Sequence, residues 1–148
     1  VRGYILGLKQ ESSRSHQDIF AQLEGYCQHL LQNFDFHVRL NLPAHLSPFA
    51  SSAVEAQLLY VIREALSNAR AHSGQKEAEV TVTFDERRVC AVIEDHGKGF
   101  TGRGREGHFG LGIMRERAEE AGGSLEIGSA PGSRAAGKVR WEFSRTLR

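Results

Sequence analysis

A long amphipathic segment, residues 51–72, places the strongest constraint on what this chain can fold into. Its apolar residues recur at the three- and four-residue spacing of an α-helix. They are Val54, Leu58, Val61, Ile62, Ala65, Leu66 and Ala69. Ser73-Gly74 then provides a helix stop. A helix with an apolar stripe of this length must bury it against another layer, so the rest of the chain must supply that layer.

Alternating or continuous apolar runs predict five strands that can form a sheet. They cover residues 36–42, 80–84, 89–93, 124–128 and 138–147. The run 89–93 is continuously apolar, which is typical of a central strand. Cys90 lies inside this run and is predicted to be a small core residue.

Two further helices complete the pattern, over residues 15–33 and 109–121. Between strand 89–93 and the last helix, residues 96–108 contain five glycines and no apolar periodicity. A loop of this length is typical of a functional lid. The order of elements predicts one α/β domain, a two-layer sandwich of a mixed β-sheet with helices on one face.

Charge and composition exclude several classes of function. The chain has 148 residues and a formal net charge of +1, which implies no strong attraction to nucleic acid or a membrane surface. Its two cysteines, Cys27 and Cys90, fit a reducing compartment better than a disulfide framework. No apolar run approaches the roughly 18 residues of a membrane span. We expect a soluble cytoplasmic domain, whose parent protein can still be membrane-anchored.

Glu64 and Asn68 lie four residues apart on the predicted helix 51–72, so they share one of its faces. Asparagine is disfavoured inside helices because its amide competes for backbone hydrogen bonds. One interpretation is a polar pair that faces solvent. The other is a metal site, because the side-chain carbonyl oxygen of Asn68 suits Mg²⁺ and Glu64 could orient a water or a ligand around it.

A second motif, Asp95-His-Gly97-Lys-Gly99-Phe100, follows the predicted central strand. An ionised carboxylate only accepts hydrogen bonds, so Asp95 could take one from an exocyclic amine such as that of adenine. The glycines would let the backbone approach a planar ligand closely. The alternative is an ordinary turn at a strand end, since Asp and Gly both favour turns.

A third motif, Gly107-His-Phe-Gly110-Leu-Gly112, overlaps the start of the predicted helix 109–121. Exposed backbone N–H groups and the helix dipole favour anions there, and phosphate groups are the natural ligand. A flexible hinge without a ligand is the alternative interpretation.

In this order, the three motifs resemble the ATP-binding domain shared by gyrase, histidine kinases and MutL, the GHKL superfamily. The similarity is greatest to sensor kinases that pair with NarL-type response regulators. The matching strings are Glu-Ala-Leu-Ser-Asn-Ala at 64–69, Asp-His-Gly-Lys-Gly-Phe at 95–100 and Gly-Leu-Gly-Ile-Met-Arg-Glu-Arg-Ala at 110–118. The resemblance extends over about residues 36–147 and includes the turn at Ala130-Pro-Gly132.

The resemblance implies a Bergerat-type ATP-binding fold with a left-handed βαβ connection, and ATP and Mg²⁺ as ligands. It implies that Asn68 coordinates Mg²⁺ and that Glu64 supports the metal shell or a proton acceptor. Asp95 would bind the adenine amino group, and residues 101–109 would form the lid. The other nucleotide-binding positions that it implies are His72, Gly97, Gly99, Phe100, Gly107, Gly110, Leu111 and Gly112.

The same resemblance implies protein-histidine kinase activity in a two-component signal transduction system. The γ-phosphoryl group would pass to a histidine on a separate dimerisation domain and then to a response regulator of NarL type. Residues 1–14 are interpreted as the tail of the upstream dimerisation helix plus a linker, and residues 15–148 as the catalytic domain. The parent protein is expected to be a homodimer, with no nucleic-acid partner.

Three positions depart from the family pattern. Ala71 stands where the family usually has Lys or Arg, with Arg70 one place early, and His96 stands where Asn or Asp is frequent. The segment Arg134-Ala-Ala-Gly137 replaces an expected Gly-Thr pair. These departures keep a second hypothesis open, a nucleotide-binding regulatory module with little or no kinase activity. A serine kinase or ATPase of the same superfamily is a further alternative.

Overall fold

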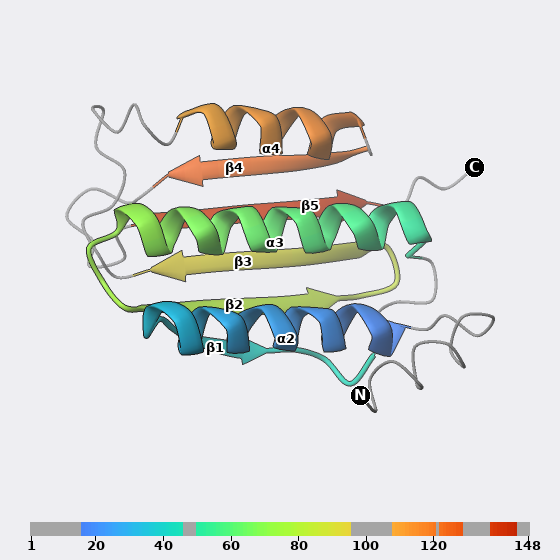
Figure 1. Ribbon diagram of the computed structural model, residues 1–148. Coiled ribbons are helices and arrows are strands. Elements are labelled where there is room, and N and C mark those ends of the chain that lie inside the picture. The colour runs from blue at the N-terminus through green and yellow to red at the C-terminus, as the bar shows by residue number, and fades with distance from the viewer. Residues whose placement is uncertain (1–15, 46–49, 96–107, 121, 129–136, 145–148) are drawn as a thin grey trace.

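The structure, a computed structural model, describes residues 16–45, 50–95, 108–120, 122–128 and 137–144 (Figure 1). Their elements follow the order α2 (His16–Phe34), β1 (His37–Asn41), α3 (Ser52–His72), β2 (Glu77–Phe84), β3 (Arg88–Asp95), α4 (His108–Glu120), β4 (Gly123–Gly128) and β5 (Gly137–Ser144). The predicted tail and linker at 1–14, and the predicted lid up to residue 107, lie outside the described residues.

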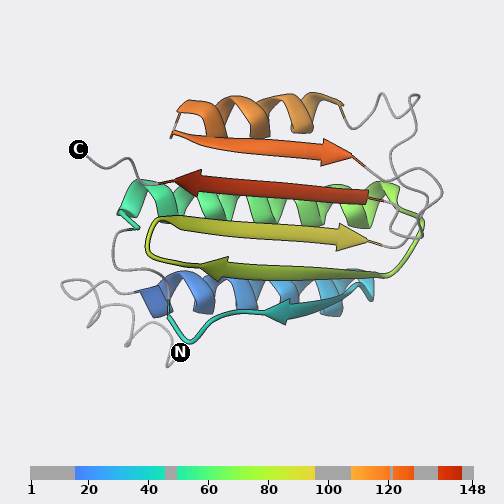
Figure 2. The ribbon, with the colours of Figure 1, turned by 180° about the vertical axis from the view of Figure 1, so that it is seen from behind.

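The five strands form one mixed sheet in the order β1-β2-β3-β5-β4. β1 pairs with β2 in parallel, and the other neighbours are antiparallel. In Figure 1 the helices α2, α3 and α4 lie on the near face, and in Figure 2 the strands of the opposite face are seen directly. The predicted two-layer α/β sandwich is confirmed, with β3 as its central strand.

The connection from β1 through α3 to β2 has an unusual hand. With the helices toward the viewer in Figure 1, β1 and β2 both run to the right and β2 lies above β1. That arrangement is a left-handed crossover, as the family resemblance implies, whereas almost all parallel βαβ units are right-handed. The hand brings α3 over the middle of the sheet, where its apolar stripe is covered by β3 and β5.

Local sequence signals set most element ends. Ser51 caps α3 by accepting a hydrogen bond from the Val54 backbone N–H at 3.3 Å. Gly74 follows the helix with φ 79°, in the left-handed region that glycine adopts without strain. β2 begins at Glu77, three residues before the predicted start at Val80, because residues 77–79 pair in register with β1.

The core lies between the α3 stripe and the helix-facing side of the sheet. All seven predicted stripe residues of α3 are buried. Along β3 burial alternates, so Val89, Ala91 and Ile93 face the helices. Cys90 points to the helix-free face and is only partly buried, so its prediction as a core residue is wrong. The strand is central, as its continuous apolar run predicted, but helices cover only one face of the sheet, so alternate residues of the run are only partly buried.

No helix among the residues that the structure describes combines the length and apolar character of a membrane span.

Candidate functional site

One end of the sheet collects the predicted functional elements. α3 and β3 end there, while α4 and β5 begin there, at the left of Figure 1. α3 contacts both β3 and α4 along its length. Asn68 on α3 and Gly112 on α4 are 44 positions apart in the sequence, with Asp95 of β3 between them, and this topology brings all three toward one edge.

Asn68 lies on the last part of α3 and is partly buried. Its Nδ2 atom is buried and has no hydrogen-bond partner in the structure. Leaving a buried donor unsatisfied is unfavourable, by roughly 1–3 kcal/mol. An unsatisfied group of this kind is typical of a site that keeps its polar atoms for a ligand. The first interpretation of Asn68, a polar residue facing solvent, does not fit this burial.

Two neighbours of Asn68 on α3 were also predicted to act at the site. Glu64, one turn earlier, is partly buried, and His72, one turn later, is exposed at the end of the helix. The three residues therefore form a polar row that runs toward the end of the sheet where β3 stops. Gln57 has a buried Oε1 without a partner too, but it lies eleven residues before Asn68, about 16 Å along the helix axis.

Asp95 is the last residue of β3 and is only 7% exposed. It falls on the same face of the strand as Ile93, which is the face that the helices cover. Its backbone pairs with Ala78 of β2 on one side and with Gly137 of β5 on the other. A carboxylate that caps a turn is normally exposed to water, so a buried one at a strand end points to a ligand-binding role.

α4 brings the third motif to the same end of the sheet. Met114 and Ala118 lie on the buried side of this helix. Gly112 is exposed, and a Cβ atom built on it would meet nothing within 4 Å. The guanidinium of Arg117 lies 4.9 Å from the centre of the Tyr60 ring of α3. This cation–π contact joins the last turn of α4 to the first half of α3, away from the site, and fixes the two helices against each other.

Several predicted residues cannot be located. Gly97, Gly99, Phe100 and Gly107 lie outside the described residues. The backbone of Gly110 and Leu111 belongs to the first turn of α4. The structure thus places Glu64, Asn68, His72, Asp95 and Gly112 around one edge of the molecule.

Sequence reasoning missed two contacts between the elements that carry the site, one at the site and one at the other end of the helices. Gly137 lies directly opposite Asp95, and the Tyr60–Arg117 contact joins two of the functional helices. Both depend on pairs far apart in the chain. The length of the apolar stripes could have suggested that α3 and α4 pack together, but the β3–β5 register could not have been read from either strand alone.

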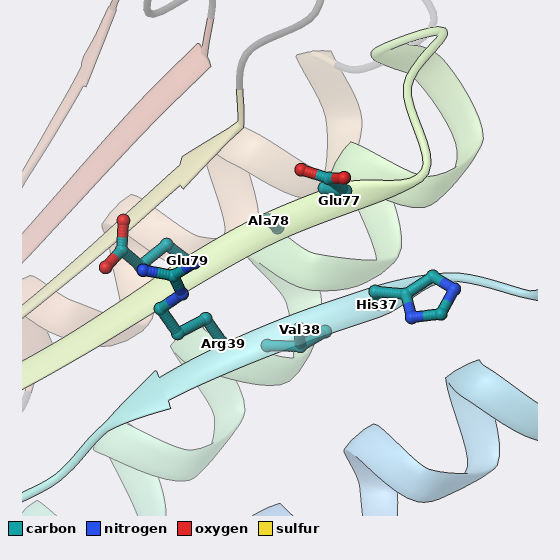
Figure 3. Close-up of a pocket in the computed structure, with 6 residues that line it drawn as sticks. All are labelled: His37, Val38, Arg39, Glu77, Ala78 and Glu79. Carbon is teal, nitrogen blue, oxygen red and sulfur yellow. The ribbon is translucent and has the colours of Figure 1, made fainter.

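An open hollow lies elsewhere, over the helix-free side of β1 and β2 (Figure 3). Its lining is formed by His37, Val38, Arg39, Glu77, Ala78 and Glu79. In Figure 3, Arg39 and Glu79 extend from neighbouring strands toward the same side. Charges of both signs compensate each other there, and none of the predicted functional residues lines this hollow. It is not part of the candidate site.

Comparison with known proteins identifies bacterial sensor proteins, including sensor histidine kinases, as relatives of this chain. The chain is 37% identical over 108 residues to the nitrate/nitrite sensor protein NarX of Escherichia coli, which covers 71% of this chain and 18% of that protein. It is 39% identical over 88 residues to the sensor histidine kinase YhcY of Bacillus subtilis, covering 58% of this chain and 23% of that protein. The chain therefore spans about a fifth of the length of these relatives.

Solved structures agree on the fold. The histidine kinase AdeS of Acinetobacter baumannii superposes with a TM-score of 0.66 at 12% identity, covering 90% of this chain and 66% of that chain. The cytoplasmic segment of the histidine kinase QseC gives a TM-score of 0.60 at 20% identity, covering 97% of this chain and 92% of that chain. The model of the family described as histidine kinase-, DNA gyrase B- and HSP90-like ATPase matches residues 53–145. With Asn68, Asp95 and Gly112 near one edge of a mixed sheet, this chain belongs to that ATPase family.

Proposed function

We propose that this chain is the ATP-binding catalytic domain of a sensor histidine kinase, which transfers the γ-phosphoryl group of ATP to a histidine on a separate dimerisation domain. The observation that carries the proposal is the pairing of a buried carboxylate, Asp95, with a buried and unsatisfied amide, Asn68, at the same end of the fold. Family membership supports the ATP part, and the sensor-kinase relatives support the histidine-kinase part.

In the proposed site, Asp95 accepts a hydrogen bond from the adenine amino group. Gly97 and Gly99 shape the base pocket with Phe100, and Gly107, Gly110, Leu111 and Gly112 contact the phosphates with His72. The N-terminal turn of α4 contributes backbone N–H groups and the positive end of its dipole. The residues of this chain thus bind and orient the nucleotide, which is the main requirement of phosphoryl transfer.

The residues present fit Mg²⁺ as the companion of ATP. Asn68 offers a carbonyl oxygen, and its Nδ2 has no competing partner that fixes the amide in another orientation. Mg²⁺ takes few protein ligands and keeps waters and phosphate oxygens for the others. Asn68 would hold the ion, with Glu64 supporting its shell of water, and the ion would neutralise phosphate charge during transfer.

The proposed partners follow from the sensor-kinase relatives. They are the dimerisation domain that carries the acceptor histidine and a response regulator, which NarX-like similarity suggests is of NarL type. We propose a homodimeric parent protein with this domain in the cytoplasm, residues 1–14 as the tail of the dimerisation helix plus a linker, and residues 15–148 as the catalytic domain.

Calorimetry with ATP in the presence and absence of Mg²⁺ tests the binding step. We expect heat of association that depends on Mg²⁺ in the wild type and is lost in Asn68→Ala. Circular dichroism of the same samples must show intact secondary structure. Well-folded wild-type protein that gives no heat at millimolar ATP would contradict the proposal.

A test of the transfer step needs the proposed dimerisation domain that carries the acceptor histidine. Mixing this domain with the dimerisation domain of its parent protein and labelled ATP should yield phosphate on histidine, which is labile in acid. Acid-stable phosphate would instead favour a serine kinase of the same superfamily, and release of free phosphate alone would favour an ATPase.

One observation favours a second candidate, a nucleotide-binding module with little kinase activity. The cation expected three residues after Asn68 is absent, because Ala71 stands there. Arg70 does not replace it, since its guanidinium lies 4.0 Å from the centre of the Phe34 ring of α2. Normal ATP binding by the parent protein without any phosphate transfer would support this candidate.

A further inference from the structure

We infer that Tyr60 and Arg117 are positioning residues for the phosphate-binding end of α4: their cation–π contact fixes how α4 is rotated about its own axis, and this rotation aims the backbone N–H groups of its first turn at the phosphates. The inference rests on the proposed function, which assigns those N–H groups to ATP. Neither side chain needs to touch the nucleotide, and Tyr60 belongs to none of the three motifs.

Few side chains hold α4 on the rest of the fold. Among those that the structure describes on this helix, only Met114 and Ala118 are buried. They lie four residues apart, so they form a single line along one side of the helix. Gly112 and Ile113, nearer the site, are exposed. Two anchors on one line hold a helix down but leave it able to rotate about that line.

The contact with α3 supplies a third anchor away from this line. At about 100° per residue, Arg117 projects about 60° from Met114 and about 100° from Ala118 around the helix. Its guanidinium lies 4.9 Å from the centre of the Tyr60 ring. Seven buried side chains hold α3 in place. Tyr60 is therefore a fixed reference against which the rotation of α4 is set.

Both helices lead from this contact to the site. α3 ends and α4 begins at the same end of the sheet, so the two helices run in opposite directions (Figure 1). Asn68 lies about 12 Å along α3 from Tyr60, and Gly110 lies about 10 Å along α4 from Arg117. A rotation of α4 by about 20° would move backbone atoms at a radius of roughly 2.3 Å by roughly 0.8 Å. Hydrogen bonds to phosphate weaken steeply over such a displacement.

The adenine end of the proposed site should not respond to this rotation. Asp95 lies on β3, whose backbone is paired with β2 on one side and with β5 on the other. Losing the contact between α3 and α4 should therefore weaken the binding of phosphates and leave the binding of the base unchanged. A general loss of structure would weaken both.

Titrations of the whole chain with Mg-ATP and with adenosine separate these effects. Calorimetry gives the Kd for ATP, and displacement of ATP gives the Kd for adenosine, which has the base but no phosphate. In Tyr60→Leu we expect the Kd for ATP to rise about two- to fivefold and the Kd for adenosine to keep its wild-type value. Tyr60→Phe retains the aromatic face and should bind both ligands like the wild type.

Arg117→Leu removes the cation and should raise the Kd for ATP by the same factor as Tyr60→Leu. The double variant Tyr60→Leu/Arg117→Leu should show no further rise, because the two residues act through one contact. Arg63→Leu is the matched control. It removes another cation–π contact of α3, in which the guanidinium of Arg63 lies 5.0 Å from the centre of the Tyr26 ring of α2. This variant should keep the wild-type Kd for both ligands even where its melting temperature falls.

Several results would overturn the inference. They are an unchanged Kd for ATP in Tyr60→Leu, an equal loss of ATP and adenosine binding in that variant, a Tyr60→Phe variant as weak as Tyr60→Leu, and additive effects in the double variant. Absence of ATP binding by the well-folded wild type would instead overturn the proposed function itself.

Discussion

The two ends of the sheet are built on different principles. At the end away from the site, two polar residues satisfy local needs of the backbone. Ser51 caps α3, and Asp85 accepts hydrogen bonds from the backbone N–H groups of Arg87 and Arg88 at 2.8 Å each. At the site end, Asn68 has a buried donor without a partner and the Asp95 carboxylate is buried over a glycine. Buried atoms without a partner also occur at Gln57 and Trp141, so the site end is distinguished by polar groups that different elements, α3 and β3, bring to one edge.

Two aspartates make the contrast within one hairpin, because Asp85 precedes β3 and Asp95 ends it. Asp85 is exposed, and the backbone hydrogen bonds from Arg87 and Arg88 hold the pKa of its carboxyl below the usual range. Its role is complete within four residues of sequence. Asp95 is buried among residues from distant segments. An aspartate thus stabilises an exposed local turn at one end and is buried at the proposed binding site at the other.

Exchanging each aspartate for alanine should produce the largest difference between the two ends. We expect Asp95→Ala to raise the Kd for ATP by roughly ten- to a hundredfold, because a hydrogen bond to a charged group is worth about 1.5–3 kcal/mol. Asp85→Ala should leave that Kd unchanged and lower the melting temperature. Calorimetry and thermal melts on both variants measure the two effects. If the two variants bind ATP equally well, the proposed difference in role between Asp95 and Asp85 is wrong.

A glycine at the far end provides the next test. A Cβ on Gly123 would lie 2.7 Å from the carbonyl oxygen of Glu142 and 3.4 Å from that of Ala118. These are backbone atoms, which cannot move aside without disturbing β5 and α4. Gly123→Ala should therefore lower the free energy of unfolding by about 1–3 kcal/mol, as measured by urea denaturation.

Nucleotide affinity should not follow that loss of stability. The Kd of Gly123→Ala for ATP, measured where the protein is fully folded, should equal that of the wild type. A loss of ATP affinity comparable to that of Asp95→Ala would mean that the two ends are coupled, and the comparison would then fail.

The contrast also explains how much of the molecule could be predicted. Helix periods, strand alternation and the stop at Ser73-Gly74 are local, so the helices, the strands and the layer arrangement followed from the sequence. Position Cys90 was predicted wrongly because an apolar run does not reveal how many faces of its strand are covered. The opposition of Asp95 and Gly137 was out of reach because it depends on the register between strands 42 residues apart.

The unsatisfied amide of Asn68 should lower the stability of the folded protein. Asn68→Leu replaces an unsatisfied buried donor with an apolar side chain of similar size. We expect the free energy of unfolding to rise by about 1 kcal/mol while Mg²⁺-dependent ATP binding is lost. Urea denaturation and calorimetry measure the two changes. Arg70→Leu, two residues along α3, serves as a control and should gain no stability, because it removes the contact with Phe34. A destabilised Asn68→Leu would mean that the amide is satisfied after all.

The smallest effect is expected from the charge on Asp85. Because its pKa is lowered in the folded state, its ionised form stabilises the fold above the unfolded pKa, and this contribution is lost as the pH falls below about 4. Asp85→Asn keeps an oxygen that can accept from the turn but removes the charge. The variant should melt slightly below the wild type at pH 7, and the two melting temperatures should approach each other as the pH falls below about 4. Glu86→Gln, in the same turn and also exposed, should show no such convergence, because the backbone N–H groups of Arg87 and Arg88 donate to Asp85. If the difference in melting temperature between Asp85→Asn and the wild type stays the same as the pH falls below about 4, the stabilisation comes from the shape of the side chain and not from its charge.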